Sequence, residues 1–307
     1  PPVSATDPLV ANLQSPIVTT GNSITIEDLP CGTDFSFAVI AQKNYNHFAA
    51  VSGTVNASTT SPASCLNFPL IGDGGMARQI TASITGDTIF VAGGFSKVYS
   101  KGGSSYTRNN IFAFSSSTGN VFDWSCNVDG QINGICVDKT SGKIYIGGMF
   151  NNVAGTARKY LASLNSNGTL NTSFAPPSFN DVIGGGGGTC MTLNKTNDTL
   201  FFWGQFSNYT DNDNNTWNRH HIAALLTSDG SASAFDTDVD YLSTATCRFF
   251  TLSPNGRSLL VGSNSGGMNL NSIDIATGIS DFDYQVSGGL VASGWYDGSK
   301  YMYFGGA

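Results

Sequence analysis

Residues 142–176 read GKIYIGGMFNNVAGTARKYLASLNSNGTLNTSFAP, and this stretch decides the fold because its pattern recurs along the chain. It begins with a run of β-branched and aromatic residues, Lys143–Phe150, which is interrupted by Gly148. Arg158 then precedes a second apolar run, and a turn glycine and Phe174 close the unit. Such runs predict β-strands, and a glycine inside one predicts a strand end or a close approach to another backbone.

Four further runs match the first one. The shared glycine is Gly93, Gly148, Gly204, Gly262 and Gly306, with spacings of 55, 56, 58 and 44 residues. The arginine recurs as Arg108 and Arg219 but is absent from the fourth copy. An arginine repeated at the start of a strand is expected to pair with a carboxylate or with carbonyls of the adjacent turn rather than to bind a ligand.

Each unit contains four short strand signals separated by turn signals, and no segment shows helical periodicity. Four-stranded units with a period near 50 predict a β-propeller, because one sheet cannot bury both faces and stacked sheets cover each other. We therefore expect an all-β fold with at least four four-stranded blades and a truncated fifth. The expected blades are 71–125, 126–177, 178–238, 239–285 and 286–307. Since the last copy stops inside its second strand, we expect the natural chain to continue.

The stretch quoted above resembles the delta-sixty repeat, a propeller module of exported and cell-surface proteins. The resemblance covers about four and a half copies of the repeat. It implies a propeller fold and supplies no catalytic residues to transfer. The fourth copy departs from the pattern, because it lacks both the arginine and the phenylalanine that follows the glycine.

Residues 1–62 read differently, with strand signals at Ser23–Leu29, Phe35–Ala41 and Ala49–Thr59. The pattern Leu29-x-x-Gly-Thr-x-Phe35 resembles the corner between strands E and F of fibronectin type III domains. That resemblance implies the second half of an immunoglobulin-like sandwich, completed by upstream sequence or by a strand from another chain. Residues 63–70 are expected to form a linker.

Six cysteines suggest two different roles. Cys31 and Cys65 lie in polar, turn-rich surroundings at the same end of the predicted strands, so a disulfide between them is possible in an oxidising compartment. Cys136, Cys190 and Cys247 lie in apolar strand segments, where buried free thiols are expected. The partner of Cys126 is left open, and the cysteine spacing does not fit a zinc site.

Charge excludes several classes of partner. The chain has 14 Lys and Arg against 21 Asp and Glu, a net charge of −7, and only 11% of its residues are charged. Few basic residues argue against nucleic acid or anionic membrane as a partner. No apolar stretch is long enough to cross a bilayer. A surface solvated by hydroxyls and amides suits a chain that works outside the cell or at its surface.

Seven N-x-S/T sequons are present, about as many as chance gives, but most fall in predicted turns that a glycan can reach. They are Asn56, Asn167, Asn171, Asn194, Asn197, Asn208 and Asn214. Asn208 and Asn214 lie in the longest polar loop and are the first candidates for N-glycans.

No catalytic or cofactor motif stands out. His47, His220 and His221 are expected at exposed turn or strand-start positions. Asp211-Asn-Asp-Asn-Asn215 has the oxygen density of a calcium loop, but Thr216 and Ile222 stand where an EF-hand needs Gly and Glu.

Two acidic clusters nevertheless leave cation binding open. An irregular calcium site at Asp211, Asp213 and Asn215 is a weak alternative to a polar loop. The alternating residues Asp236, Asp238 and Asp240 indicate a solvated strand face or, less favoured, a cation site.

Two functions remain in view. The first is a non-catalytic extracellular structural or adhesive glycoprotein, such as a filament subunit whose partners are copies of itself or surface proteins and glycans. The second is a carbohydrate- or ligand-binding propeller within a larger enzyme. The first is favoured because function must be argued from a site, and no catalytic arrangement is visible.

Overall fold

The computed structural model divides the chain into two compact units, residues 1–67 and 68–307, which are described separately. Of the first unit the structure describes only four strands: β1 (Asp34–Phe37), β2 (Gln42–Asn44), β3 (His47–Phe48) and β4 (Val55–Ser58). Of the second it describes residues 68–306 except 101–102, 180–189, 238–246, 264–267, 287–290 and 297–301.

In the first unit β1 pairs with β4 in antiparallel register, with Asp34 opposite Ser58. Strands β2 and β3 form a second antiparallel pair. β4 lies within the predicted strand Ala49–Thr59, and β1 overlaps the start of the predicted strand Phe35–Ala41. The segment Ser23–Leu29 and the cysteines Cys31 and Cys65 lie outside the described residues, so the immunoglobulin-like module and the disulfide stay predictions.

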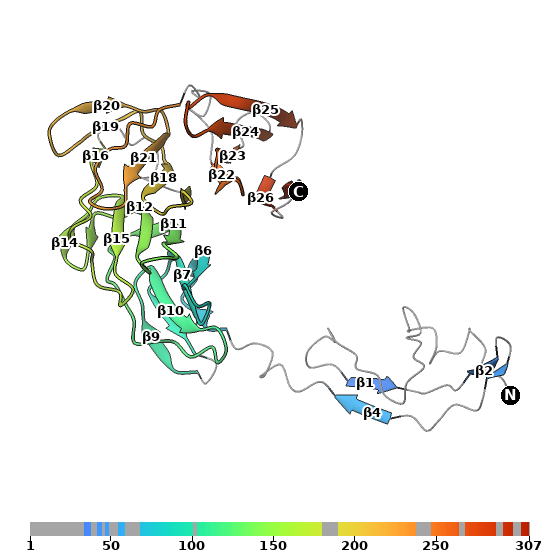
Figure 1. Ribbon diagram of the computed structural model, residues 1–307. Coiled ribbons are helices and arrows are strands. Elements are labelled where there is room, and N and C mark those ends of the chain that lie inside the picture. Colours follow the sequence, from blue (N-terminus) through green and yellow to red (C-terminus); the bar gives the residue numbers. More distant parts are fainter. Residues whose placement is uncertain are drawn as a thin grey trace. The chain divides into compact units, whose positions relative to one another are not determined.

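The second unit contains five successive antiparallel sheets, numbered 1 to 5 (Figure 1). Sheet 1 comprises β6 (Met76–Ala82), β7 (Thr88–Gly94) and β10 (Ile111–Ser115). Sheet 2 comprises β11 (Gln131–Val137), β12 (Ile144–Met149) and β15 (Leu161–Leu164). Sheet 3 comprises β17 (Cys190–Leu193), β18 (Thr199–Trp203) and β21 (Ile222–Leu226). Sheet 4 comprises β22 (Cys247–Leu252), β23 (Ser258–Ser263), β24 (Met268–Asp274) and β25 (Ser280–Val286). Sheet 5 comprises β26 (Val291–Tyr296) and β27 (Met302–Gly306).

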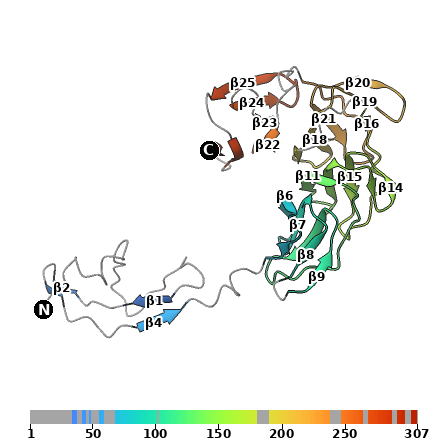
Figure 2. The same cartoon turned by 180° about the vertical axis from the view of Figure 1, so that it is seen from behind.

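The first strands of successive sheets lie side by side in the order β6, β11, β17, β22 and β26. Figures 1 and 2 show sheets 1 to 4 following one another in a curved row. The residues that the structure describes are all strand, turn or irregular, which confirms the all-β class. None of them forms a helix that is long and apolar enough to span a bilayer.

The hydrophobic core lies between sheets rather than within one. Phe90 of sheet 1 belongs to one buried cluster with Ile135 of sheet 2. Tyr145 of sheet 2 shares the next cluster with Met191 of sheet 3, and Phe201 of sheet 3 shares another with residues of sheet 4. Sheets 2 and 3 therefore each have a forward face, which packs on the following sheet, and a backward face, which packs on the preceding one.

The expectation of four-stranded blades was wrong for sheets 1 to 3, which have three strands each. The fourth strand signal is reduced to single bridges, such as Phe114 with Val121 and Leu164 with Leu170. A short outer hairpin stands between the second and third strand of each sheet instead. The hairpins are β8–β9 (Lys97–Tyr99, Ser105–Thr107), β13–β14 (Asn152–Val153, Thr156–Ala157) and β19–β20 (Asn208–Thr210, Thr216–Asn218). The preceding chain adds β5 (Leu70–Ile71) to the first hairpin and β16 (Ser178–Phe179) to the third.

Sheet 4, the copy without the arginine, has no such hairpin among its described residues and runs through four consecutive strands. The shorter path from β23 to β24 accounts for the shorter spacing of 44 residues after Gly262. The copy that fits the sequence pattern least well is thus the one that forms the expected four-stranded sheet.

The repeated glycine faces a β-bulge in the first strand. In sheets 1 and 2 the register shifts between Ala77 and Gln79 and between Ile132 and Gly134. A Cβ on Gly93 would lie 2.0 Å from the carbonyl oxygen of Met76, so this position needs glycine because two backbones approach closely.

The position of the same bulge in sheet 4 shows which residue of the fourth copy is equivalent to Gly148. In sheet 4 the shift falls between Cys247 and Phe249, which are opposite Ser263 and Gly262. Ser263 therefore takes the position of Gly148, and the equivalence of Gly262 with Gly148 was wrong by one residue. Glycine alone is a poor marker of register here, because this copy has the single Gly262 where the first, second and fifth copies have a pair.

We predict that Gly93→Ala lowers the free energy of unfolding by about 1–3 kcal/mol, because the new methyl group overlaps a backbone carbonyl that cannot move independently. Gly94→Ala is the matched control, since a Cβ there meets only the end of the flexible Gln131 side chain, at 2.9 Å. Thermal unfolding of the two variants would show it. Equal melting temperatures would contradict the close approach.

Candidate functional site

The repeated arginine begins a backbone corner that is built alike in three sheets. The residue two positions after it has a left-handed backbone: φ is 66° at Asn110, 69° at Tyr160 and 67° at His221. The carbonyl of this residue accepts a hydrogen bond from the bulge-facing glycine, at 2.9 Å from Gly93 to Asn110, for example. The corner therefore fixes the third strand against the second at the level of the bulge.

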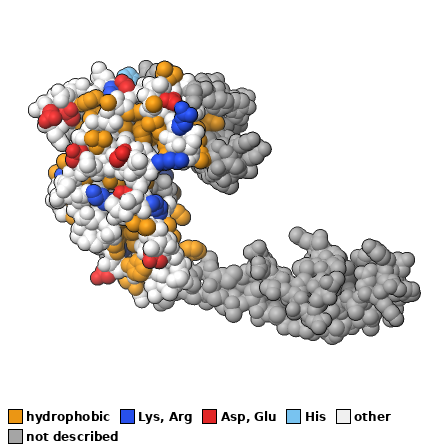
Figure 3. Space-filling model, in the orientation of Figure 1, with side chains coloured by type: hydrophobic (Ala, Val, Ile, Leu, Met, Phe, Trp, Pro, Cys, Tyr) orange, Lys and Arg blue, Asp and Glu red, His pale blue; other side chains and the backbone are white. Residues whose placement is uncertain are grey.

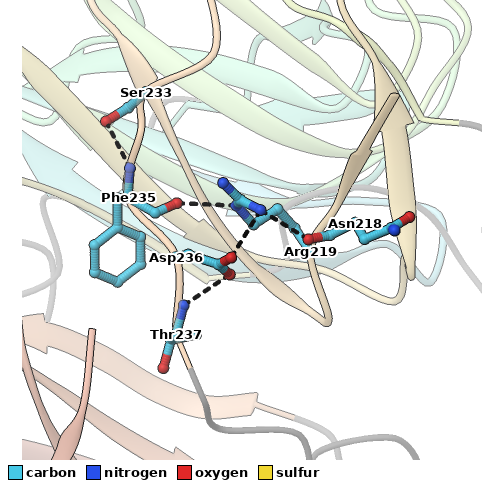
Figure 4. Close-up of polar contacts among 6 residues, drawn as sticks. All are labelled: Asn218, Arg219, Ser233, Phe235, Asp236 and Thr237. Carbon is cyan, nitrogen blue, oxygen red and sulfur yellow. Dashed lines mark hydrogen bonds and ion pairs between the residues drawn. The ribbon is translucent and has the colours of Figure 1, made fainter. Parts of the chain in front are cut away.

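The arginine side chain closes this corner, as Figure 4 shows for Arg219. Its Nε donates to the carbonyl of Phe235 at 3.0 Å, and its Nη1 donates to the carbonyl of Asn218 at 2.8 Å. Nη1 also lies 2.9 Å from the carboxylate of Asp236. The guanidinium stands over the ring of Trp217, 5.1 Å from its centroid. Arg219 is buried, and all of its described contacts are to its own repeat.

The other two arginines repeat this arrangement. Arg108 donates to the carbonyl of Phe122 at 2.9 Å and lies 3.6 Å from the carboxylate of Asp123. Arg158 donates to the carbonyls of Ala157 and Thr172. These contacts are the carbonyl and carboxylate partners expected from the sequence, which confirms the structural role of the arginines.

An aromatic residue ends each of the first three repeats and packs on the second strand of the same sheet. The ring centroids are 5.2 Å apart for Phe90 and Trp124, and 5.4 Å apart for Tyr145 and Phe174. Trp124 also donates from its indole nitrogen to the carbonyl of Ser166, a turn residue of the following sheet, at 2.9 Å. We call Trp124, Phe174 and Phe235 the closing aromatics, because they join one sheet to the next.

A polar groove of about 620 Å³ opens between sheets 1 and 2 on the side of the bulges. Asp73, Asn109, Asn127 and Asp129 line it, together with glycines such as Gly94. The side-chain amide of Asn109 donates to that of Asn127 at 2.8 Å. Asparagine and aspartate side chains along an open groove offer hydrogen-bond donors and acceptors of the kind that a sugar hydroxyl needs.

The two carboxylates of the groove already have partners within the protein. Asp129 accepts hydrogen bonds from the backbone amides of Asn151 and Asn152, and these bonds lower the pKa of its carboxyl group. Asp73 lies 3.7 Å from the ammonium group of Lys97. The sequence did not single out this groove. Its only signal is that Gly94 stands where the next copy has Met149.

The sequons lie in different environments. Asn214 is exposed at the tip of the β19–β20 hairpin, and Asn167 is exposed in a turn. Asn194, Asn197 and Asn208 are half-buried. Asn171 is only 7% exposed, so the folded chain leaves no room for a glycan on its amide. Asn56 lies in β4.

The oxygen-rich loop Asp211–Asn215, considered above as a calcium site, is explained by hydrogen bonds within its own hairpin. The carboxylate of Asp211 accepts bonds from the backbone amides of Asp213 and Asn215 and from the indole of Trp217, which together lower its pKa. The carboxylate thus holds its own hairpin turn. Asp238 and Asp240 lie outside the described residues. Within the described part of the chain, no group of three His, Cys, Asp or Glu side chains is placed to hold a metal ion.

The histidines differ from one another. His220 is exposed, as expected. His221 is half-buried and stacks on Trp203 with ring centroids 5.9 Å apart, so the expectation of an exposed position was wrong for it. At the equivalent corner position of sheet 1, the side chain of Asn110 donates a hydrogen bond to the carbonyl of Val128. The side chains at this position in sheets 1 and 3 are thus used in hydrogen bonding and in packing. His47 lies in β3.

The four described cysteines are free thiols: Cys126 and Cys247 are buried, and Cys136 and Cys190 are half-buried. Burial raises the pKa of Cys126 to about 11 and raises that of Cys136 as well, more through burial than through the nearby Asp138 carboxylate. Neutral thiols of this kind are poor nucleophiles.

Comparison with known proteins supports the fold. A family model described as a domain of unknown function (DUF5122) beta-propeller matches residues 140–174, which overlap nearly all of the repeat quoted at the outset. No curated protein matches. Together with the stacked sheets, the family match indicates that the second unit has a β-propeller fold.

One similar solved structure is hydrazine synthase of Kuenenia stuttgartiensis. It has a TM-score of 0.44 and 13% identity, and the match covers 74% of this chain and 54% of that chain. The present chain thus spans about half the length of that enzyme chain. A likeness at this score carries no argument about function.

We predict that Arg219→Lys lowers the free energy of unfolding by about 1–3 kcal/mol, because lysine cannot reach both the Phe235 carbonyl and its own turn. The ion pair with Asp236 adds little, since that carboxylate is largely exposed. Arg78→Lys, at an exposed bulge position, is the matched control. Denaturant unfolding would reveal the difference, and equal midpoints would contradict a structural role for the guanidinium.

Proposed function

We propose that this chain is a non-catalytic structural or adhesive component of an extracellular assembly. The observation that carries this proposal is the use of the repeated arginines. Arg108, Arg158 and Arg219 close the corners of their own sheets through backbone carbonyls, and Asp123 and Asp236 add a carboxylate partner to the first and third of them. Side chains that recur in three copies and contact only their own repeat serve construction rather than chemistry.

The surface is consistent with this role. In Figure 3 the charged side chains of the described residues are scattered among uncharged polar surface. The face drawn there shows neither a basic stripe for nucleic acid nor an acidic cleft for a cationic substrate among its described residues. Exposed sequons at Asn167 and Asn214 would add glycans on the outer turns of sheets 2 and 3.

Location and adhesion can be tested in the source cells. Antibody against the chain should label intact, unpermeabilised cells, and disruption of the gene should reduce their attachment to a solid surface. A disruption strain that carries the gene again is the control for attachment. A chain that is found only inside the cells would overturn the proposal.

A second candidate function is binding of a carbohydrate in the polar groove between sheets 1 and 2. The observation that favours it is the open space of about 620 Å³ beside the amides of Asn109 and Asn127. An adhesive propeller would contact a surface glycan through such a groove, so the two candidates are compatible.

We predict that, if the chain is made through a eukaryotic secretory route, Asn214→Gln removes one glycan while Asn171→Gln removes none. The reason is exposure, since the Asn214 turn is open and Asn171 is packed in the fold. Intact-mass measurement before and after deglycosylation would check both. A chain whose mass does not change on deglycosylation would contradict the glycoprotein proposal.

For the groove, we predict that the chain binds immobilised oligosaccharides and that Asn127→Ala weakens this binding about tenfold, the effect of losing one to two hydrogen bonds. Asn120→Ala, an exposed amide in a turn away from the groove, is the control. A glycan array read with both variants would decide, and absent or unchanged binding counts against the groove.

A further inference from the structure

A second cavity, of about 400 Å³, lies between sheets 1 and 2 at the turns that join their first and second strands. We call it the turn-side pocket, because the polar groove described above opens at the other end of the same strands, beside the bulges. Its walls are residues of the turn 83–88, Phe90 and residues 122–124 of the first copy, and Val137, Gly142 and Ser166 of the second. The pocket therefore belongs to an interface between two packed sheets and not to an end of the row.

Ile84 is an apolar residue of this pocket at a position that is charged in the next two copies. The turns between the first and second strands are six residues long, and their second residue is Ile84, Lys139 or Lys195. All three side chains are exposed, that of Ile84 to 51%. The Cδ1 atom of Ile84 points toward sheet 2, since it lies 3.5 Å from the place that a Cβ on Gly142 would take. The first copy thus turns an exposed isoleucine toward the pocket where the other two copies have lysine.

Phe122 departs from the repeat in the same direction. It stands two positions before the closing aromatic of its copy, and the matching residues of the next two copies are Thr172 and Ser233. Its side chain is 37% exposed, whereas Phe90 and Trp124, the other aromatic residues of the pocket, are at most 9% exposed. A single exposed apolar residue needs no explanation, but two that depart from the repeat and line one pocket indicate a binding site.

The hydroxyl groups of the turn are bonded to one another and to Asp87 instead of facing a ligand. Ser83 and Thr88 donate to the carboxylate of Asp87 at 2.9 and 3.0 Å. The hydroxyl of Thr85 forms a hydrogen bond of 3.4 Å with that of Ser83. The indole nitrogen of Trp124 is used as well, in its bond to the following sheet. The pocket differs in this respect from the groove, because little hydrogen-bonding capacity is left for a sugar.

The charges around the pocket also have partners within the protein. The carboxylate of Asp123 lies 3.6 Å from the guanidinium of Arg108, which donates to the carbonyl of Phe122. The ammonium group of Lys139 donates to the carbonyls of Ala82 and Ser83. A charged ligand would lose its hydration here without gaining an unpaired ion in return, so the pocket suits an uncharged group.

We propose that the turn-side pocket binds one uncharged aromatic ring or branched aliphatic group. Five apolar side chains line it, and a concave site with mostly apolar walls is the usual form of a site for such a group. They are Ile84, Phe90, Phe122, Trp124 and Val137. The group can belong to a free small molecule or to a side chain of a partner protein. The site is independent of sugar binding in the groove, because the two cavities are lined by different residues.

The test uses p-cresol, an uncharged aromatic ring, as the probe and the full 307-residue chain as the protein. Ligand-observed NMR titration is expected to show saturable binding. In the proton–nitrogen correlation spectrum the indole resonance of Trp124 should shift, and its loss in Trp124→Phe assigns it. The anion p-toluate, which has a carboxylate in place of the hydroxyl, should bind about tenfold more weakly, because its charge must be desolvated.

Variants that take residues from the other copies test the lining. Ile84→Lys and Phe122→Thr are each expected to weaken p-cresol binding about tenfold, because each replaces apolar lining by a polar side chain. Both introduce residues that the same positions hold in the second copy, so the fold should be kept, and melting curves check this. Ile279→Lys is the matched control, since Ile279 is a 55% exposed isoleucine in a turn of sheet 4, and it should bind like the wild type.

Several results would overturn the proposal. They are binding that does not saturate, a Trp124 resonance that does not move, or unchanged binding in both Ile84→Lys and Phe122→Thr. Asn127→Ala, which alters the groove, should leave p-cresol binding unchanged; weaker binding in this variant would place the probe in the groove and reject the pocket.

The source of the group is decided with N-acetyltyrosinamide, which carries the same ring on a peptide backbone. Binding at least as tight as that of p-cresol supports the pocket as a site for a side chain of a partner protein. Weaker binding supports it as a site for a free small molecule, because the backbone then hinders entry of the ring.

Discussion

The structure depends on one constraint: a small sheet with two apolar faces is stable only when another sheet covers each of them. Phe90, Tyr145 and Phe201 stand at the same position of successive second strands, and each points into the interface with the following sheet. Every other repeated feature keeps this stack in register. The bulge and its facing glycine bring two backbones together, and the left-handed corner ties the third strand to that glycine. The arginine then links the corner to the residues that end the repeat.

The sequence predicts the repeat well because its key positions require glycine or arginine, which few other residues can replace. Gly93 and Gly148 are glycine for the same steric reason, a close approach to the backbone of the first strand, so their spacing reveals the period. The arginines recur because their planar donor group matches fixed carbonyls. Strand count is harder to read, since a single bridge such as Phe114 to Val121 and a full fourth strand have the same apolar and turn signals. The outer hairpins were not predicted for the same reason, because their short strands have the same apolar and turn signals as a fourth strand.

The candidate groove could not be predicted, because it forms where a glycine, Gly94, has no side chain to fill the space. Gly94 leaves space where Met149 fills the equivalent position, and that space has meaning only once the two sheets are placed beside each other. The exposure of a single residue cannot be predicted from the sequence either. Asn171 and Asn214 have the same sequon, yet one is packed beside Ser163 and the other caps a hairpin. His221 differs from His220 only because the corner turns it onto Trp203.

The extensive contacts among the described strands join only neighbouring sheets, and this has a mechanical consequence. A load applied along the row of described sheets passes through one interface after another, because none of these extensive contacts joins sheets that are not neighbours. Under tension the sheets therefore separate singly, each rupture releasing about fifty residues of slack before the next interface is strained. A fibre of such units would lengthen in steps and dissipate energy at each one, so it would stretch under a pull instead of snapping.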